Sequence, residues 1–361
     1  MTDMSDAGVT MQTDLAAVRG VVNSLLRQYI ETAGRDAELI SPILGSFWEQ
    51  IGSVIQAGGK RLRPYLVVLA YEACGGQHRR AVMPVAAAWE MLHQALLIHD
   101  DIIDHDTWRH NQPNVAGLYR KTYELATGQP QVQAADATAL LAGDILLAAA
   151  QQLILSSEVP LVLKPELTKL MSYAYQATCY GELLEVEAPF RPLIGVDALQ
   201  VAEFKTAYYS VSGPLQSGAM LAGAPEELLD QLAELGRLLG IAYQLTDDLL
   251  GVFGDTELTG KSITSDLAEA KRTRLLQLAH LQLGEADQIR METILEQTSI
   301  ADSDVATLKQ LIETSRATET LNLEIDNHVA LAKQILERLP ILDEPKERFT
   351  ELIESLVERQ T

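Results

Sequence analysis

Apolar residues recur every three or four positions through most of the chain, a pattern that predicts α-helices. The longest Ala- and Leu-rich segments cover residues 81–104, 135–155 and 228–253, and several of them are apolar on almost every side. Helices of that kind are buried inside a bundle. The two-residue alternation of half-buried strands is scarce. The pattern therefore predicts an all-α protein.

Proline and glycine lie mainly between these segments, and no low-complexity linker or strong repeat divides the chain. Residues 1–15 are polar, and we expect them to be disordered. We expect residues 16–361 to form a single α-helical domain. Nearly half of the residues, 47%, are hydrophobic, so a chain of this length can bury a core around an internal cavity.

The chain is strongly acidic, with 28 Lys and Arg against 50 Asp and Glu and a formal charge of −22. This balance argues against a general nucleic-acid binder and against docking on anionic lipid. An anionic substrate stays possible where cations reverse the field locally. The N-terminal residues lack a signal-peptide pattern, and no apolar run reaches the ~18 residues of a membrane span. We therefore expect a soluble, cytoplasmic protein.

Two aspartates one turn apart end the first long apolar segment. Asp100 and Asp104 share a face of the predicted helix, whereas Asp101 lies about 100° away. Such carboxylates repel each other unless water screens them or a hard cation such as Mg²⁺ binds there. A solvated helix end is the alternative. His93 lies two turns earlier on the same stripe, which favours the functional interpretation.

A second pair of aspartates, Asp247 and Asp248, follows another apolar helix. Four residues after Asp247 the chain has Gly251, so a metal here would depend on Asp247 and water. Aspartate clusters at the ends of two separate apolar helices predict a cavity with metal sites on both walls.

The segment GGKRLRP at 58–64 places Lys60 and Arg63 three residues apart, after two glycines. If a helix begins there, both cations and the free backbone N–H groups face one point, which suits a diphosphate. A solvated basic turn is the alternative. Single cations in motif-like surroundings follow at Arg109, Lys205, Lys261 and Lys271. The segment GDTELTGKS is no P-loop, because five residues instead of four separate its glycines.

In this order, six motifs resemble the trans-polyprenyl diphosphate synthases, also called the polyprenyl synthetase family. They are GGKRLRP, HQALLIHDDIIDHDTWRHNQP, LLAGDILLAAA, GELLEVE, KTAYYS and YQLTDDLLGVFGDTELTGKSITSDLAEAKRT. The resemblance implies an isoprenoid-synthase-type orthogonal helical bundle around a deep central cavity, and a homodimer. It also implies a prenyltransferase that joins isopentenyl diphosphate head-to-tail to an allylic diphosphate, with Mg²⁺, three ions per active site, as cofactor.

The resemblance assigns roles by position. Asp100 and Asp104 match the Mg²⁺ ligands of the family's first aspartate-rich motif, and Asp247 matches that of the second. The isopentenyl diphosphate site is matched by Lys60, Arg63, His93 and His110. The allylic diphosphate site is matched by Arg109, Lys205, Thr206, Gln244, Lys261 and Lys271. Catalytic roles are implied for Asp100, Asp104, Arg109, Lys205, Asp247 and Lys261.

These residue types fit the reaction. Breaking the allylic C–O bond produces an allylic cation and free diphosphate, and Mg²⁺ with Lys and Arg would neutralise that leaving group. The departing diphosphate can take the proton lost after condensation, so no dedicated protein base is needed. An apolar tunnel would keep water away from the cation.

Two departures from the family pattern affect the expected activity. His110 replaces an arginine that contacts isopentenyl diphosphate, so we expect weaker or more pH-dependent binding. Gly251 replaces the last aspartate of the second motif. Both leave open an alternative, a non-catalytic or weakly active subunit of a heteromeric synthase.

Product length depends on the residues just before the first aspartate motif, where aromatic side chains stop the growing chain in this family. Here they are Ala95 and Leu96, so we expect geranylgeranyl diphosphate (C20) or a longer product. Among other enzymes, an HD-type phosphohydrolase would use His99 and Asp100 but leaves the basic motifs unexplained. A terpene cyclase would not need Lys60 and Arg63 for a second diphosphate.

Overall fold

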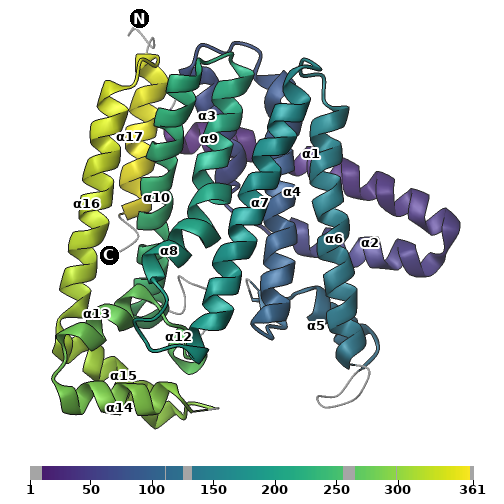
Figure 1. Ribbon diagram of the computed structural model, residues 1–361. Coiled ribbons are helices and arrows are strands. Elements are labelled where there is room, and N and C mark those ends of the chain that lie inside the picture. Colours follow the sequence, from purple (N-terminus) through teal and green to yellow (C-terminus); the bar gives the residue numbers. More distant parts are fainter. Residues whose placement is uncertain (1–9, 110, 125–131, 255–264, 298, 358–361) are drawn as a thin grey trace, which may run out of the picture. The chain divides into compact units, whose positions relative to one another are not determined.

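The chain is almost wholly helical in a computed structural model (Figure 1). The structure describes residues 10–109, 111–124, 132–254, 265–297 and 299–357. Within these residues the only strands are β1 (Trp108–Arg109) and β2 (Gln112–Pro113), which pair antiparallel as a short hairpin. The predicted all-α fold class is therefore confirmed.

The helical elements follow one another along the chain from the N-terminal side. The first are α1 (Met11–Ile40), α2 (Pro42–Gln56), α3 (Leu62–Ala73), α4 (Arg79–Ile103), α5 (Val115–Thr122), α6 (Val132–Ser156), α7 (Leu163–Glu187) and η1 (Ala188–Phe190). They are followed by α8 (Ala198–Ala202), η2 (Glu203–Ser212), α9 (Gly213–Leu221), α10 (Glu226–Phe253) and α12 (Ser265–Ala268). The last are α13 (Arg274–Gln282), α14 (Glu285–Leu295), α15 (Asp302–Ser315), α16 (Ala317–Arg338) and α17 (Asp343–Val357).

By their internal contacts the residues group into two compact units. The single domain expected over residues 16–361 stays a prediction. Unit 1 comprises the chain up to Lys169 with Ser217–Ala224 and Leu342–Pro345. Unit 2 comprises Leu170–Gln216, Pro225–Ile341 and the chain from Lys346 onward. Three of the dividing points fall inside α7, α9 and α17, and the other two fall in the connections between α9 and α10 and between α16 and α17.

Helical structure is present from Met11 onward, within the segment 1–15 that was expected to be disordered. Thr10 caps α1, with its Oγ1 accepting a hydrogen bond from the Thr13 backbone N–H, and residues 11–15 are helical. Met11 and Asp14 in the first turn are buried. Asp14 forms an ion pair with Arg79 at the start of α4. This tertiary contact fixes a segment whose polar sequence alone indicates disorder.

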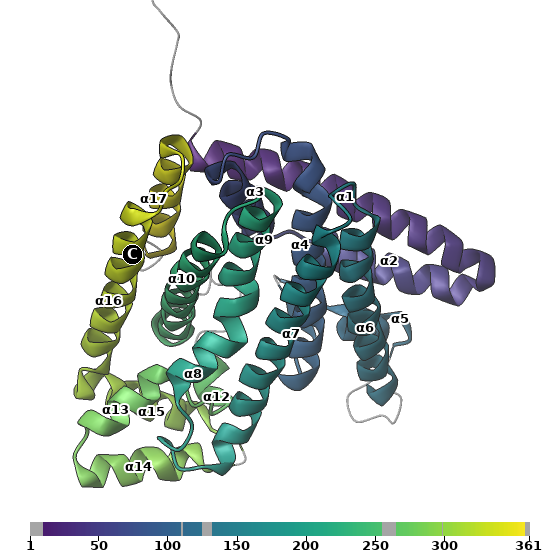
Figure 2. The same cartoon turned by 45° about the horizontal axis from the view of Figure 1, so that its top comes forward.

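Unit 1 is built around α4, whose side chains are buried on almost every side. Trp89 in its middle is fully buried, and its indole N–H donates a 2.9 Å hydrogen bond to Ser217 Oγ. The helices α1 and α2 form an antiparallel hairpin in unit 1 (Figures 1 and 2). Ser41 separates them and caps α2, which begins with Pro42. Unit 1 thus contains both the basic segment before α3 and the aspartates that end α4.

Two helices of unit 1 are long and apolar enough to cross a membrane by length and composition alone. In α4 the apolar window is 72% buried inside the structure, as in the core helix of a soluble protein. In α6 the corresponding window, within Gln133–Ser156, is 39% buried. Of these two helices, α6 therefore leaves more of its apolar surface exposed.

Unit 2 is organised around α10, along which η2 and α16 pack (Figure 2). Leu245, Leu249 and Val252 of α10 are buried in a hydrophobic cluster with side chains of α13 and α15. The helix ends at Phe253, shortly after Asp247 and Asp248. Unit 2 thus contains the second aspartate motif and, in η2, the KTAYYS segment.

Candidate active site

The first aspartate motif lies at the C-terminal end of α4, as predicted. Asp104 is the C-cap residue, and its backbone N–H donates to the Asp100 carbonyl oxygen at 2.9 Å, so the two residues are one turn apart. Both side chains are partly exposed. Asp101 points into unit 1 and is 3% exposed. The three aspartates therefore divide into an accessible pair and one buried carboxylate.

Arg109 connects the buried carboxylate to the accessible one. It lies in β1, and its Nε donates to Asp101 Oδ1 at 2.7 Å while its Nη2 donates to Asp100 Oδ2 at 3.1 Å. Burial raises the pKa of the Asp101 carboxyl to about 6, although Arg109 acts in the opposite direction. Asp101 thus positions Arg109. This role of Asp101 was not predicted from the sequence, although its position off the Asp100 stripe was a signal.

The basic segment turns into a helix where the sequence predicted. The backbone φ values of Gly58 and Gly59 are +133° and +129°, which residues other than glycine rarely adopt. Helix α3 begins shortly afterwards, at Leu62. Lys60 is exposed just before the helix, and Arg63 is half-buried in its first turn. His93 is half-buried on α4 of the same unit.

The two residues at the positions expected to influence product length differ in accessibility. Leu96 is half-buried one turn before Asp100, on the same face of α4. Ala95 is fully buried. Leu96 thus shares a face with the accessible aspartate, whereas Ala95 packs in the interior of unit 1.

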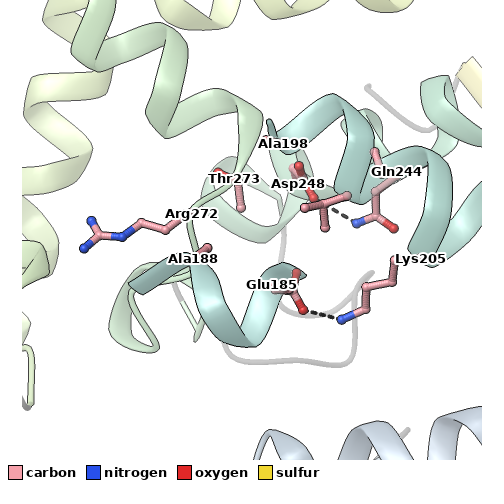
Figure 3. Close-up of a pocket in the computed structure, with 10 residues that line it drawn as sticks. Glu185, Ala188, Ala198, Lys205, Gln244, Asp248, Arg272 and Thr273 are labelled. Atoms are coloured by element: carbon pink, nitrogen blue, oxygen red, sulfur yellow. Dashed lines mark hydrogen bonds and ion pairs between the residues drawn. The ribbon is translucent and has the colours of Figure 1, made fainter. Parts of the chain in front are cut away.

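In unit 2, two residues predicted for the allylic diphosphate site touch each other. The Thr206 hydroxyl in η2 donates to Gln244 Oε1 on α10 at 2.5 Å, and Gln244 Nε2 donates to Asp248 Oδ1 at 2.9 Å (Figure 3). Asp248 is partly buried, whereas Asp247 beside it is exposed. The chain of hydrogen bonds therefore fixes Asp248 and leaves Asp247 accessible.

Lys205, which directly precedes Thr206 in η2, forms ion pairs with two carboxylates of α7. Its Nζ lies 2.9 Å from Glu182 Oε2 and also forms a short contact with Glu185 (Figure 3). These two glutamates come from the GELLEVE segment and were missed as individual site residues. Their three-residue spacing, which puts them on one helix face, was the available signal.

Lys205 also lines a pocket whose residues all belong to unit 2. Its polar lining consists of Glu185, Lys205, Gln244, Asp248, Arg272 and Thr273. The Arg272 guanidinium is directed away from the others (Figure 3), and burial lowers its pKa. Lys271 pairs with Glu269 at 3.1 Å. Two further residues predicted for the site, His110 and Lys261, lie outside the described residues.

The carboxylates fit a magnesium ion. No cluster of three His, Cys, Asp or Glu side chains able to hold a metal occurs among the described residues. Mg²⁺ is commonly held by one or two carboxylates together with water and substrate phosphates. The accessible oxygens of Asp100 and Asp104, and those of Asp247, are hard donors of that kind.

The segment η2 is π-helical over its ten residues and packs closely against glycines of two neighbouring helices. A Cβ on Gly181 of α7 would lie 2.2 Å from the Lys205 backbone nitrogen. A Cβ on Gly240 of α10 would lie 2.4 Å from the Ala207 Cα. These two glycines therefore allow α7 and α10 to approach the backbone that carries Lys205 and Thr206. π-Helical turns are common at functional sites.

Gly181→Ala is expected to displace the backbone of Lys205 and lower the free energy of unfolding by about 1–3 kcal/mol. Gly20→Ala on α1, where a Cβ meets nothing within 4 Å, is the matched control. It should raise the free energy of unfolding by about 0.5–1 kcal/mol. Urea unfolding measures both. Equal stabilities for the two variants would show that α7 does not constrain η2.

Comparison with known proteins adds a family to this geometry. The Polyprenyl synthetase family matches the chain over residues 47–314. A (2E,6E)-farnesyl diphosphate synthase of Mycobacterium tuberculosis is 32% identical over 306 residues, which are 84% of this chain and 80% of that protein. A geranylfarnesyl diphosphate synthase of Aeropyrum pernix is 32% identical over 314 residues, 85% of this chain and 92% of that protein.

The fold has solved counterparts. A geranylgeranyl pyrophosphate synthase from Corynebacterium glutamicum, crystallised with isoprenyl diphosphate and magnesium, superposes with a TM-score of 0.83 at 26% identity. The superposition covers 94% of this chain and 99% of that one. The isoprenoid-synthase-type fold predicted from the motifs is thus confirmed. On this evidence the chain belongs to the polyprenyl synthetase family of prenyltransferases.

Proposed function

We propose that this chain condenses isopentenyl diphosphate with an allylic diphosphate and so makes an all-trans polyprenyl diphosphate. The observation that carries the proposal is the arrangement at the end of α4, where Arg109 is bound to Asp100 beside the accessible Asp104. A cation and two carboxylates at the end of an apolar helix can hold a metal-bound diphosphate. The names of the relatives support the same chemistry.

In this proposal each unit contributes its own diphosphate-binding groups. Lys60 and Arg63 bind isopentenyl diphosphate in unit 1, with His93 as a further donor. His110 is a further ligand of isopentenyl diphosphate. The allylic diphosphate is bound by Arg109, Lys205, Thr206, Gln244, Lys261 and Lys271. The lysine and arginine side chains donate to phosphate oxygens more strongly as negative charge develops, and this favours ionisation over the bound ground state.

Metal ions complete the leaving-group site. Asp100 and Asp104 would hold Mg²⁺ in unit 1 and Asp247 in unit 2, with three ions in all. When bound, Mg²⁺ supplies positive charge that stabilises the departing diphosphate. The Nη2 group of Arg109 would then donate to the diphosphate instead of to Asp100, while its Nε stays hydrogen-bonded to Asp101. The departing diphosphate takes the proton released after condensation, so the proposed reaction needs no dedicated protein base.

The test is incubation of the purified chain with Mg²⁺, isopentenyl diphosphate and, separately, C5, C10, C15 and C20 allylic diphosphates. Mass spectrometry should detect a ladder of products ending at one length, with C20 or longer as the final product. No condensation with any primer would overturn the proposal and favour the subunit of a heteromeric synthase. Release of phosphate without isopentenyl diphosphate would favour a hydrolase.

Leu96→Phe is expected to shorten the final product by at least one five-carbon unit. The ring would occupy space on the face of α4 that also holds Asp100, where we propose that the growing chain passes. Ala95→Phe should do the same if Ala95 also borders that path, and should otherwise destabilise the core by about 1–3 kcal/mol with unchanged products. Product chromatography and thermal unfolding of both variants distinguish these results.

The outer face of α6 supports a homodimer. Four large apolar side chains there are exposed: Leu140, Leu141, Ile145 and Leu155. Large exposed apolar side chains gathered along one helix are typical of a protein–protein interface, and a two-fold dimer buries the same surface on both subunits. The strongly negative net charge disfavours anionic lipid as the cover. We therefore propose a soluble, cytoplasmic homodimer with no nucleic-acid partner and no transmembrane segment.

Leu141→Lys is expected to convert this dimer to a monomer in light scattering after size-exclusion chromatography without detergent. Leu161→Lys, at another exposed leucine of unit 1, is the control and should stay dimeric. A wild-type protein that elutes as a monomer would contradict the dimer.

A further inference from the structure

Arg61 lies between two cations of the proposed isopentenyl diphosphate site but points the other way. Its side chain is buried, with 3% of the residue exposed. Each of its three guanidinium nitrogens donates to a different helix. Nε reaches Asn23 Oδ1 of α1 at 2.8 Å, and Nη2 reaches the carbonyl oxygen of Ile55 in α2 at 2.6 Å. Nη1 reaches Glu90 Oε1 of α4 at 2.7 Å.

These contacts hold the backbone in a conformation that it would otherwise avoid. Arg61 has φ +55° and ψ +42°, in the left-handed region that is unfavourable for residues other than glycine. It is the residue from which α3 starts. Lys60 directly precedes it and Arg63 follows it in the first turn, so the backbone at Arg61 sets the direction of both cations.

The same network reaches the part of α4 that carries His93. Glu90 is 2% exposed, and its Oε1 also accepts a 2.9 Å hydrogen bond from Gln94 Nε2. Gln94 follows His93 directly. Removal of one partner from a buried ion pair is costly, but replacement of both partners by apolar residues is often neutral or stabilising. Stability alone therefore does not account for this pair.

We infer that Arg61 is a positioning residue, which through Glu90 aligns Lys60 and Arg63 with the α4 face that holds His93. The inference rests on the proposed function, because it concerns the isopentenyl diphosphate site of that reaction. Arg61 itself has no role in contacting substrate, since its donors are engaged by the protein.

Arg61→Lys keeps the charge but loses the three-way contact. We expect it to raise the Kd for isopentenyl diphosphate, measured by titration calorimetry, and its KM by roughly tenfold or more. The kcat and the KM for the allylic diphosphate should change by less than about threefold, because the groups around Asp100 and Lys205 are untouched.

Arg79→Lys is the matched control. Arg79 also ties α4 to α1 and α3 of unit 1, through Asp14 and Glu72, but at the opposite end of α3 from Arg63. It should lower the melting temperature and leave the Kd for isopentenyl diphosphate unchanged. An increase in that Kd comparable to that of Arg61→Lys would show a general loss of packing and overturn the inference.

The double variant Arg61→Met with Glu90→Met covers the case in which Arg61→Lys does not fold. It should restore the melting temperature while binding of isopentenyl diphosphate stays weak. Recovery of wild-type affinity would mean that Arg61 only neutralises Glu90, and would overturn the inference. If the wild-type chain itself neither binds isopentenyl diphosphate nor makes product, the proposed function fails together with the inference. If the wild-type chain binds isopentenyl diphosphate and both Arg61 variants bind it equally well, the inference is refuted and the proposed function stands.

Discussion

Asp100→Asn is expected to lower kcat for condensation by about 10²–10³-fold. The substitution removes one of the two accessible carboxylate charges at the end of α4 and the Asp100 partner of Arg109. Asp101 still holds Arg109 through Nε, so the fold should persist and the melting temperature should change little. Steady-state kinetics over a range of Mg²⁺ concentrations should also show a higher half-saturating concentration.

Asp136→Asn is the control for this prediction. Asp136 also pairs with an arginine in unit 1, Arg120, at 3.0 Å, but the pair is more exposed and lies outside the proposed site. Exposed ion pairs contribute little, so the control should keep near wild-type kinetics and stability. Activity of Asp100→Asn within threefold of wild type would show that this carboxylate is not a metal ligand.

Lys205→Met is expected to lower kcat/KM for the allylic diphosphate by about 10²-fold. Lys205 is the cation between Glu182 and Glu185, so its loss leaves two partly buried carboxylates that repel each other and any approaching diphosphate. The KM for isopentenyl diphosphate should change little, because its proposed ligands belong to the other unit. Initial rates with each substrate varied in turn measure both effects.

Two further variants make this prediction specific. Lys205→Arg keeps the charge and should retain more activity than Lys205→Met. Lys333→Met removes an exposed lysine of unit 2, paired with Glu354 at 3.3 Å, and should behave as wild type. If Lys205→Met raises the KM for isopentenyl diphosphate instead, the two substrates have been assigned to the wrong groups.

The hydrophobic pattern was sufficient to predict the fold class, because buried helices need apolar residues at three- and four-residue spacing wherever they pack. The pairing of Asp100 with Asp104 followed from the same helical spacing. The start at Met11 could not be predicted, because it depends on the contact between Asp14 and Arg79, residues far apart in the sequence. The two compact units could not be read from the sequence for another reason, since three of their five dividing points fall inside continuous helices.

The partners of the site residues were harder to predict than the residues themselves. The motifs indicated Lys205 and Arg109 as diphosphate ligands. That Glu182, Glu185 and Asp101 hold these cations is a property of the packed structure. A sequence shows the spacing of carboxylates along one helix, but the identity of a counter-ion on another helix depends on how the two helices dock.

The π-helical segment η2 has a consequence for sequence comparison and protein engineering. A wide turn of this kind accommodates an extra residue within an otherwise regular helix. Deletion of a single residue between 203 and 212 would let the segment relax to ordinary helical geometry and rotate one side of it by about 100° relative to the other. Lys205 would then lose its alignment with the glutamates of α7, or Thr206 its alignment with Gln244 of α10, without any change in their identity. Gap placement in this stretch therefore decides which residues of two relatives are truly equivalent.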